Sequence, residues 1–91
     1  MTEILIQQTN GFLRAYKKLR NNQKLAVDRA IADIAHNPTL GEAKKGDLSG
    51  VYIYKFNCIN QLFLLAYEYD PISRLLLLVG THENFYRDLK R

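Results

Sequence analysis

The sequence predicts a single α+β domain of 91 residues, with a helical hairpin packed on one face of a mostly antiparallel four-stranded sheet. Two observations lead to this prediction. Two amphipathic segments of helical period follow one another between residues 12 and 34, and three apolar, aromatic-rich segments follow between residues 51 and 79. With a short strand before them and a short helix after them, the order of elements is β-α-α-β-β-β-α. A chain of this length can bury one core, so we expect one domain over residues 1–91.

The first segment, residues 3–8, is short and apolar at its centre, which predicts a strand. Thr9 and Asn10 are residue types that favour the start of a helix. Apolar residues then recur at helical spacing: Phe12, Leu13, Tyr16 and Leu19. Asn21 and Asn22 interrupt this pattern, and we expect them to form the joint between two helices.

A second helix is predicted from about Gln23 to Ala35. Its narrow apolar stripe follows the i, i+3, i+4, i+7 spacing: Val27, Ala30, Ile31 and Ile34. Pro38 disfavours helical backbone at Asn37, so the helix should end there. The two helices form an αα-hairpin.

Residues 41–46 read as a loop that carries Lys44 and Lys45. Residues 51–56 alternate as a strand does. This alternation places Tyr52, Tyr54 and Phe56 on one face of the sheet and Ile53 and Lys55 on the other.

A hairpin turn is expected at residues 57–60. The next segment, 61–69, is too apolar for an exposed strand and should lie at the centre of the sheet. Asp70 and Pro71 favour a turn before a last buried strand at 74–79. Gly80 should release the chain into a short terminal helix, and the sheet face opposite the helical hairpin should be shallowly concave.

Thirteen Lys and Arg against nine Asp and Glu give a formal charge of +4, which favours a nucleic acid, a ribosome or an acidic protein as partner. Between positions 14 and 29 the only acid is Asp28. The basic residues of this stretch are Arg14, Lys17, Lys18, Arg20, Lys24 and Arg29. They form either a solvated helix face or a docking surface for a target.

Several classes of protein are disfavoured. No apolar run is long enough to span a bilayer, and the first six residues lack the features of a signal peptide. Cys58 is the only cysteine, which excludes an internal disulfide and fits a reducing compartment, so we expect a cytoplasmic protein without a membrane partner. His36 and His82 lie in different elements, and no cysteine pair or glycine-rich phosphate loop is present; we therefore expect no metal and no cofactor.

This order of elements, with a basic helical hairpin first, resembles the RelE/ParE superfamily, the toxins of bacterial type II toxin–antitoxin modules. Local patterns carry the resemblance: Leu-Ser-Gly at 48–50 before Val-Tyr-Ile-Tyr-Lys-Phe at 51–56, Leu-Ala-Tyr-Glu-Tyr-Asp at 65–70, and Leu-Val-Gly-Thr-His at 78–82. The ending, Gly-Thr-His-Glu-Asn-Phe-Tyr-Arg-Asp-Leu-Lys-Arg at 80–91, resembles the ParE-like group. The resemblance spans essentially the whole chain and implies a toxin.

RelE-type members of the superfamily cleave mRNA in the ribosomal A site, so the resemblance implies a metal-independent endoribonuclease as one activity. His82 would then act as acid or base, and Tyr86 would stack on a base or transfer a proton. Lys55 and Arg87 would neutralise the phosphate, with Lys44 and Lys45 binding nearby. In a structural alternative, Phe85 and Tyr86 pack the terminal segment onto the sheet.

Departures from the RelE pattern weaken this hypothesis. Ile53 stands where a basic residue is expected on the tyrosine-rich strand, and Gln61 and Leu62 stand where an arginine enters the next strand. ParE-type members inhibit DNA gyrase and cleave nothing. Such an inhibitor needs a shape-specific cationic surface, which the helical hairpin could supply through Arg14, Lys17, Lys18, Arg20 and Lys24. The missing cations favour this second, non-enzymatic activity.

Either activity implies a cognate antitoxin with an acidic, partly disordered C-terminal segment that wraps the basic domain, by occluding the concave face or displacing the terminal helix. A non-toxic nucleic-acid-binding module would use the same charge. Its usual forms, the double-stranded-RNA-binding domain and the RRM, have a different order of elements.

Overall fold

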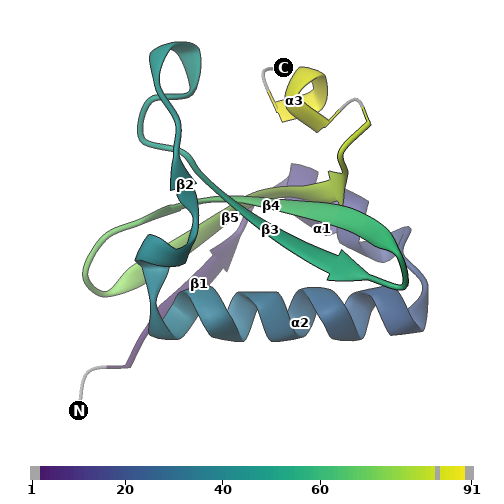
Figure 1. Cartoon of the computed structure of the whole chain (residues 1–91). Coiled ribbons are helices and arrows are strands. Elements are labelled where there is room, and N and C mark those ends of the chain that lie inside the picture. Colours follow the sequence, from purple (N-terminus) through teal and green to yellow (C-terminus); the bar gives the residue numbers. More distant parts are fainter. Residues whose placement is uncertain (1–2, 84, 90–91) are drawn as a thin grey trace.

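The computed structural model describes residues 3–83 and 85–89, and in it a sheet separates two helical layers of unequal size (Figure 1). The strands are β1 (Leu5–Gln8), β2 (Glu42–Ala43), β3 (Tyr52–Cys58), β4 (Gln61–Tyr69) and β5 (Ser73–Thr81). The helices are α1 (Asn10–Lys17), α2 (Asn21–His36) and α3 (Phe85–Leu89), with two short 3-10 turns, η1 (Pro38–Leu40) and η2 (Gly46–Leu48). The predicted α+β class and order of helices are confirmed. The two sheet faces are covered differently, by α2 below and by the short α3 above.

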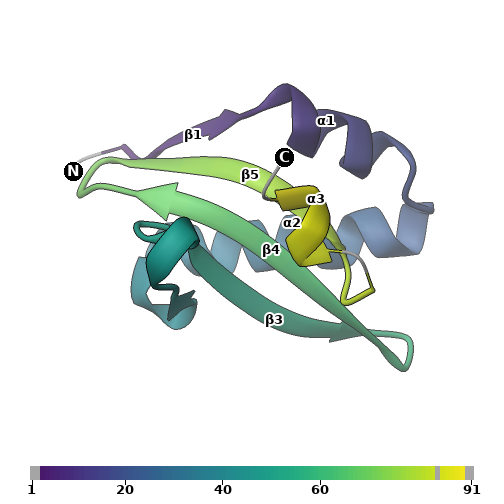
Figure 2. The ribbon, with the colours of Figure 1, turned by 90° about the horizontal axis from the view of Figure 1, so that it is seen from above.

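The strands lie in the order β1-β5-β4-β3-β2 (Figure 2). β1 runs parallel to β5, and every other pair is antiparallel. β4 occupies the centre, as its apolar sequence predicts. The prediction of four strands was wrong by one, because Glu42 and Ala43, inside the expected loop, pair with Ile53 and Tyr52. A ladder of two residues is too short to leave an alternating pattern in the sequence.

The joint between the helices lies earlier than predicted. α1 ends at Lys17 and α2 begins at Asn21, so both asparagines lie in the first turn of α2. The backbone N–H of Gln23 donates to the Asn22 side chain at 2.9 Å, and the Gln23 side chain accepts from the Arg20 N–H at 2.8 Å. These residues therefore satisfy the free N–H groups of a helix start, where the sequence pattern had suggested a break.

Two strand boundaries also differ from the prediction. The β3–β4 turn contains two residues, Ile59 and Asn60, with φ of 48° and 61°, so residues 57 and 58 belong to β3. Positive φ at both positions is the geometry of a type I′ turn, which matches the twist of the strands it joins. β5 continues through Gly80 to Thr81, so this glycine lies within the strand.

The core has two parts, one on each face of the sheet. The larger part lies under α1 and α2 and contains Phe12, Val27, Ala30, Ile34, Phe63, Leu65, Tyr67, Leu76 and Val79. The predicted aromatic stripe of β3 packs against it. The smaller part contains Val51, Ile53, Leu64, Ala66 and Phe85, and lies under α3. Two faces of unequal coverage result: α2 closes one, and α3 covers only a portion of the other.

A buried arginine joins α2 to the sheet. Arg74 of β5 is 3% exposed, and its guanidinium donates to the carbonyl oxygens of Ile34 at 3.1 Å and Ala35 at 3.0 Å. It also donates to the carbonyls of Asp70 at 2.8 Å and Ser73 at 2.9 Å. A cation at the C-terminal end of a helix satisfies carbonyls that have no helical partner and is favoured by the helix dipole.

A buried tyrosine holds the chain that leaves α2. The Tyr67 hydroxyl donates to the Pro38 carbonyl at 2.5 Å and accepts from the Gly41 N–H at 2.9 Å. A Cβ atom on Gly41 would lie 2.5 Å from this hydroxyl, so only glycine fits there. Burial raises the pKa of the Tyr67 phenol, which stays protonated and able to donate.

We expect Arg74→Met to lower the free energy of unfolding by about 3 kcal/mol, because several carbonyls lose their donor in a buried site. Chemical denaturation with a helix signal measures this change. The control is Arg29→Met, an exposed arginine on α2, which should change stability by less than about 0.5 kcal/mol. Equal stability of the two variants would contradict the role assigned to Arg74.

A substitution in the turn at Ile59 should raise the stability of the protein. A β-branched residue at positive φ is strained, and Ile59 is 71% exposed, so its side chain contributes little packing. Ile59→Asn should stabilise the protein by about 1 kcal/mol, because asparagine tolerates this backbone. The same substitution at Ile72, which is exposed without positive φ, serves as control; a gain there of the same size would show that polarity alone is responsible.

Candidate functional site

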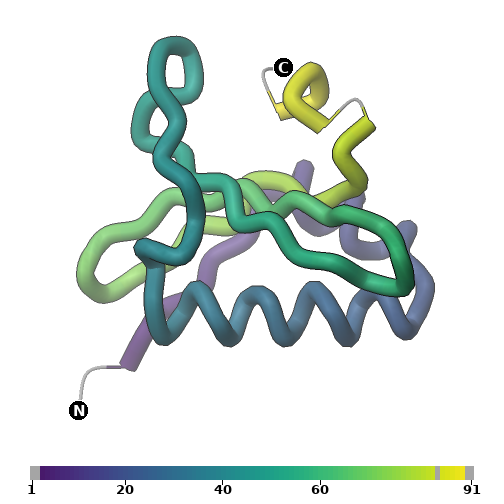
Figure 3. Tube along the Cα trace, in the orientation of Figure 1, coloured from purple at the N-terminus to yellow at the C-terminus, as the bar shows by residue number. Residues whose placement is uncertain are grey.

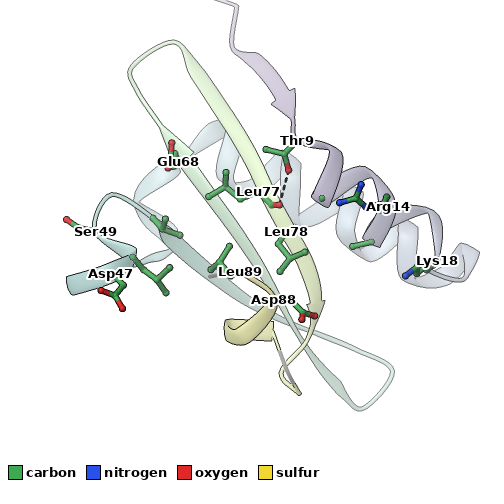
Figure 4. Close-up of a pocket in the computed structure, with 14 residues that line it drawn as sticks. Thr9, Arg14, Lys18, Asp47, Ser49, Glu68, Leu77, Leu78, Asp88 and Leu89 are labelled. Atoms are coloured by element: carbon green, nitrogen blue, oxygen red, sulfur yellow. Dashed lines mark hydrogen bonds between the residues drawn. The ribbon is translucent and has the colours of Figure 1, made fainter. Parts of the chain in front are cut away.

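A groove of about 990 Å³ lies on the sheet face that α2 leaves open (Figure 4). Its floor is formed mainly by Leu77 and Leu78 of β5 with Val51 before β3. α1 forms one side, α3 another, and the η2 turn a third. The η2 turn and the C-terminal segment rise on the same side of the sheet (Figure 3). The concave face expected from the sequence is thus present, with raised walls around it.

An irregularity in β5 shapes this floor. Ala66 pairs with Leu78 and Tyr67 with Leu76, so Leu77 has no partner in β4 and forms a β-bulge. Two consecutive leucines therefore face the groove, where regular alternation would turn one of them into the core.

The same bulge positions α1. The Thr9 hydroxyl donates to the Leu77 carbonyl at 2.9 Å and accepts from the Phe12 N–H at 3.1 Å. Thr9 is the N-cap of α1, as predicted. This pair of bonds ties the first turn of α1 to β5 and sets which face of the helix borders the groove.

Opposite charges line different sides of the groove. Arg14 of α1 and Lys18, the C-cap residue one turn later, form a cationic side. Neither makes an ion pair with an acid among residues 3–83 and 85–89. Acidic residues lie across the floor: Asp47 in η2, Glu68 in β4 and Asp88 in α3. The cations were predicted from the sequence as candidate target-binding residues and the acids were not, although Glu68 is the only charged residue in the apolar segment 61–69.

Three of the predicted site residues meet at α3, outside the groove lining. The Lys44 ammonium lies 5.4 Å from the centre of the Tyr86 ring, and the Tyr86 and His82 ring centres are 6.2 Å apart. Lys44 also forms an ion pair with Glu42 at 3.7 Å. Tyr86 packs partly against the smaller core as well, so both readings of it, packing and site residue, are compatible with its position.

The remaining candidates do not join this cluster. Lys55 is exposed on β3 and forms no ion pair within the described part of the chain. Arg87 is exposed and pairs with its neighbour Asp88 at 3.8 Å. Lys45 is exposed beside Lys44. His82, Tyr86 and Lys44 are thus linked by ring contacts, and neither Lys55 nor Arg87, which directly follows Tyr86 in α3, makes such a contact within the described residues.

The other cations of the helical hairpin lie at different positions. Lys17 and Arg20 are exposed near the end of α1, and the Lys24 ammonium lies 5.6 Å from the centre of the Tyr16 ring. The Tyr16 hydroxyl donates to the Asp28 carboxylate at 2.8 Å, and this bond raises the pKa of Tyr16. Of the basic run at 14–29, only Arg14 and Lys18 therefore line the groove.

Neither a metal centre nor a membrane-spanning helix is found in the described residues. No group of three or more His, Cys, Asp and Glu side chains among them is arranged to hold a metal ion. No helix formed by these residues is long and apolar enough to cross a bilayer.

Comparison with protein families gives one match over most of the chain. A family model described as the ParE-like toxin of type II bacterial toxin–antitoxin systems matches residues 6–90. No curated protein sequence matches.

Solved structures are similar in fold at low sequence identity. One is the RelBE2 toxin–antitoxin complex of Mycobacterium tuberculosis, with a TM-score of 0.76 and 20% identity over 89% of this chain and 100% of that chain. A second is a variant of E. coli RelE in the free state, with a TM-score of 0.74 and 14% identity. This match covers 97% of this chain and 95% of that chain. A third is the intact E. coli RelBE toxin–antitoxin complex, with a TM-score of 0.67 and 14% identity. This match covers 88% of this chain and 98% of that chain. At these identities the similarity demonstrates the fold alone.

The packing of Phe85 should hold α3 in place and so keep Tyr86 in contact with Lys44 and His82. It is 2% exposed and anchors α3 on the sheet. Truncating a buried phenylalanine costs about 3 kcal/mol or more, and a helix as short as α3 is not stable without its packing. Phe85→Ala should therefore release α3 and separate Tyr86 from Lys44, while β3, β4 and β5 stay folded.

Amide hydrogen exchange measured by NMR checks this. Residues 85–89 should lose protection in Phe85→Ala and keep it in the control Arg87→Ala, whose side chain is exposed. Unchanged protection of α3 in Phe85→Ala would contradict the anchoring role.

Proposed function

The chain belongs to the ParE-like toxin family of type II bacterial toxin–antitoxin systems, and we propose that it inhibits growth by binding DNA gyrase and is neutralised by a cognate antitoxin. The observation that supports the choice of a binding mechanism is that, within the described residues, the two expected phosphate-binding cations make no ion pair or ring contact with the other RNase candidates. Metal-independent RNA cleavage needs an acid, a base and cations converging on one phosphate. Lys55 makes no ion pair within the described part of the chain, and the ion pair of Arg87 there is with Asp88.

A binding mechanism needs only a surface of defined shape and charge. The exposed cations of α1 and the following turn supply it: Arg14, Lys17, Lys18 and Arg20. Their side chains are held on a rigid frame, because Thr9 fixes the start of α1 and the Tyr16–Asp28 bond fixes α1 to α2. Such a surface supports recognition of an acidic region on a protein target.

One observation supports a second function, a ribosome-dependent mRNA endonuclease. Lys44, Tyr86 and His82 form a compact group that contains a cation, a ring for stacking and a group able to transfer protons. The solved structures similar in fold include E. coli RelE. On this alternative the active residues would be these three, with Lys44 in the place expected for Lys55.

Controlled expression in a bacterium separates the two. We expect DNA synthesis to stop within minutes of induction and the SOS response to begin, while messages stay intact and protein synthesis continues at first. His82→Ala and Lys44→Ala should leave this toxicity unchanged, because neither residue acts in a binding mechanism. Pulse labelling of new DNA and new protein gives the readout.

The alternative gives the reverse pattern. Early arrest of protein synthesis, with cut messages and loss of toxicity in His82→Ala or Lys44→Ala, would assign the protein to the RNases. Normal growth after induction of the soluble chain would refute the toxin function altogether. The variant Arg14→Glu combined with Lys18→Glu should lose gyrase inhibition and remain folded, since both side chains are exposed.

A further inference from the structure

We propose that the groove between α1 and α3 binds an antitoxin segment that carries cationic as well as acidic side chains, on opposite flanks of an apolar stripe. This inference rests on the proposed function, because it takes the antitoxin as occupant. It departs from the expectation drawn from the sequence, in which the positive charge of the chain calls for an acidic partner.

An occupant needs an apolar stripe to cover the floor of the groove. Leu77 and Leu78 both face the groove because of the bulge; Val51 and Leu48 extend the apolar lining toward η2, and Leu89 extends it toward α3. Leu77 and Leu78 are both only partly buried. An amphipathic segment that covers them gains the free energy of removing apolar area from water, about 25 cal/mol per Å².

Where the occupant faces the α1 side of the groove, it needs acidic side chains. Arg14 and Lys18 are separated by four residues of helix, a rise of about 6 Å. A partner segment can place two carboxylates at the same spacing, one turn apart. Both cations lack an ion pair within the described residues, so this side of the groove carries uncompensated positive charge.

Where the occupant faces the acidic side of the groove, opposite α1, it needs at least one cationic side chain. Glu68 is exposed in the groove and forms no ion pair with the described Lys, Arg and His side chains. Within the described part of the chain, Asp88 makes one ion pair, with Arg87 at 3.8 Å, and its own side chain remains 50% exposed. A segment with acids on both flanks would place like charges beside these carboxylates, which is unfavourable when water is displaced.

The same charge separation disfavours nucleic acid as the occupant. A phosphate backbone carries one sign of charge along its whole length, so contact with the α1 cations would bring other phosphates toward Glu68 and Asp88. A peptide can present different signs on its two flanks. The groove therefore fits a peptide of mixed charge better than a polyanion.

Two synthetic peptides of about 16 residues test this without knowledge of the antitoxin sequence. Both carry leucines at i, i+3, i+4 and i+7. The first has glutamates on one flank and lysines on the other; the second has glutamates on both flanks. Fluorescence anisotropy with the purified full chain should give about fivefold tighter binding of the mixed peptide at low salt, and a smaller difference at high salt.

Substitutions in the chain test whether the preference for the mixed peptide arises from Glu68. Glu68→Lys should reverse the preference between the peptides, and Glu68→Gln should remove part of it. Gln61→Lys is the matched control, because it changes the net charge by the same single unit as Glu68→Gln, on the same strand and outside the groove lining. It should leave the preference unchanged. The melting temperature of each variant verifies that it is folded.

Several results would overturn the proposal. These are equal or tighter binding of the all-acidic peptide, a preference unaffected by Glu68→Lys, or displacement of the mixed peptide by a short DNA duplex. The growth experiment is independent of these measurements. A non-toxic chain that still prefers the mixed peptide would refute the toxin function and the antitoxin as occupant. A toxic chain without the preference would refute only the groove proposal.

Discussion

The architecture depends on how α2 is fixed to the sheet, and a buried cation fixes it. The Arg74 guanidinium reaches from β5 to the last carbonyls of α2, so a strand and a helix that are 40 residues apart in sequence are joined where both would otherwise leave polar groups unsatisfied. Tyr67 continues this constraint by holding η1 and the chain after it. Because the end of α2 is held on one face of the sheet, that face is covered, and apolar side chains of the opposite face, where α3 and the groove lie, stay partly open.

The groove itself follows from one irregular residue. With regular alternation after Leu76, which packs in the larger core, Leu78 would turn toward α2. Across the bulge, Leu77 and Leu78 both lie on the groove side, and the Leu77 carbonyl accepts from the Thr9 hydroxyl. The floor of the groove and the position of its cationic side, through α1, therefore have a common origin. A bulge beside a functional surface, positioning the residues around it, is a frequent use of this feature.

The parts predicted from the sequence are those that repeat along the chain. The aromatic alternation of β3, the apolar run of β4 and the helical spacing in α2 each involve several side chains that agree, so single exceptions do not hide them. β2, with two residues, has no pattern to detect. The bulge at Leu77 and the capping role of Asn22 depend on one backbone hydrogen bond each, which composition does not encode. The acidic side of the groove was missed for a different reason: Asp47, Glu68 and Asp88 are far apart in sequence, and only the fold brings them together.

The position of the groove also bears on how an antitoxin would neutralise each of the two activities. Arg14 and Lys18 belong both to the surface proposed for gyrase and to the groove. An occupant of the groove would therefore block a binding mechanism directly, by competition for the same cations, without any change in the toxin. Lys44, His82 and Tyr86 lie outside the groove lining, on α3 and the segments beside it. To silence an RNase built from these residues, the same occupant would have to move α3, which Phe85 anchors on the sheet. Competition for Arg14 and Lys18 would therefore suffice to neutralise a toxin that acts by binding its target through these cations.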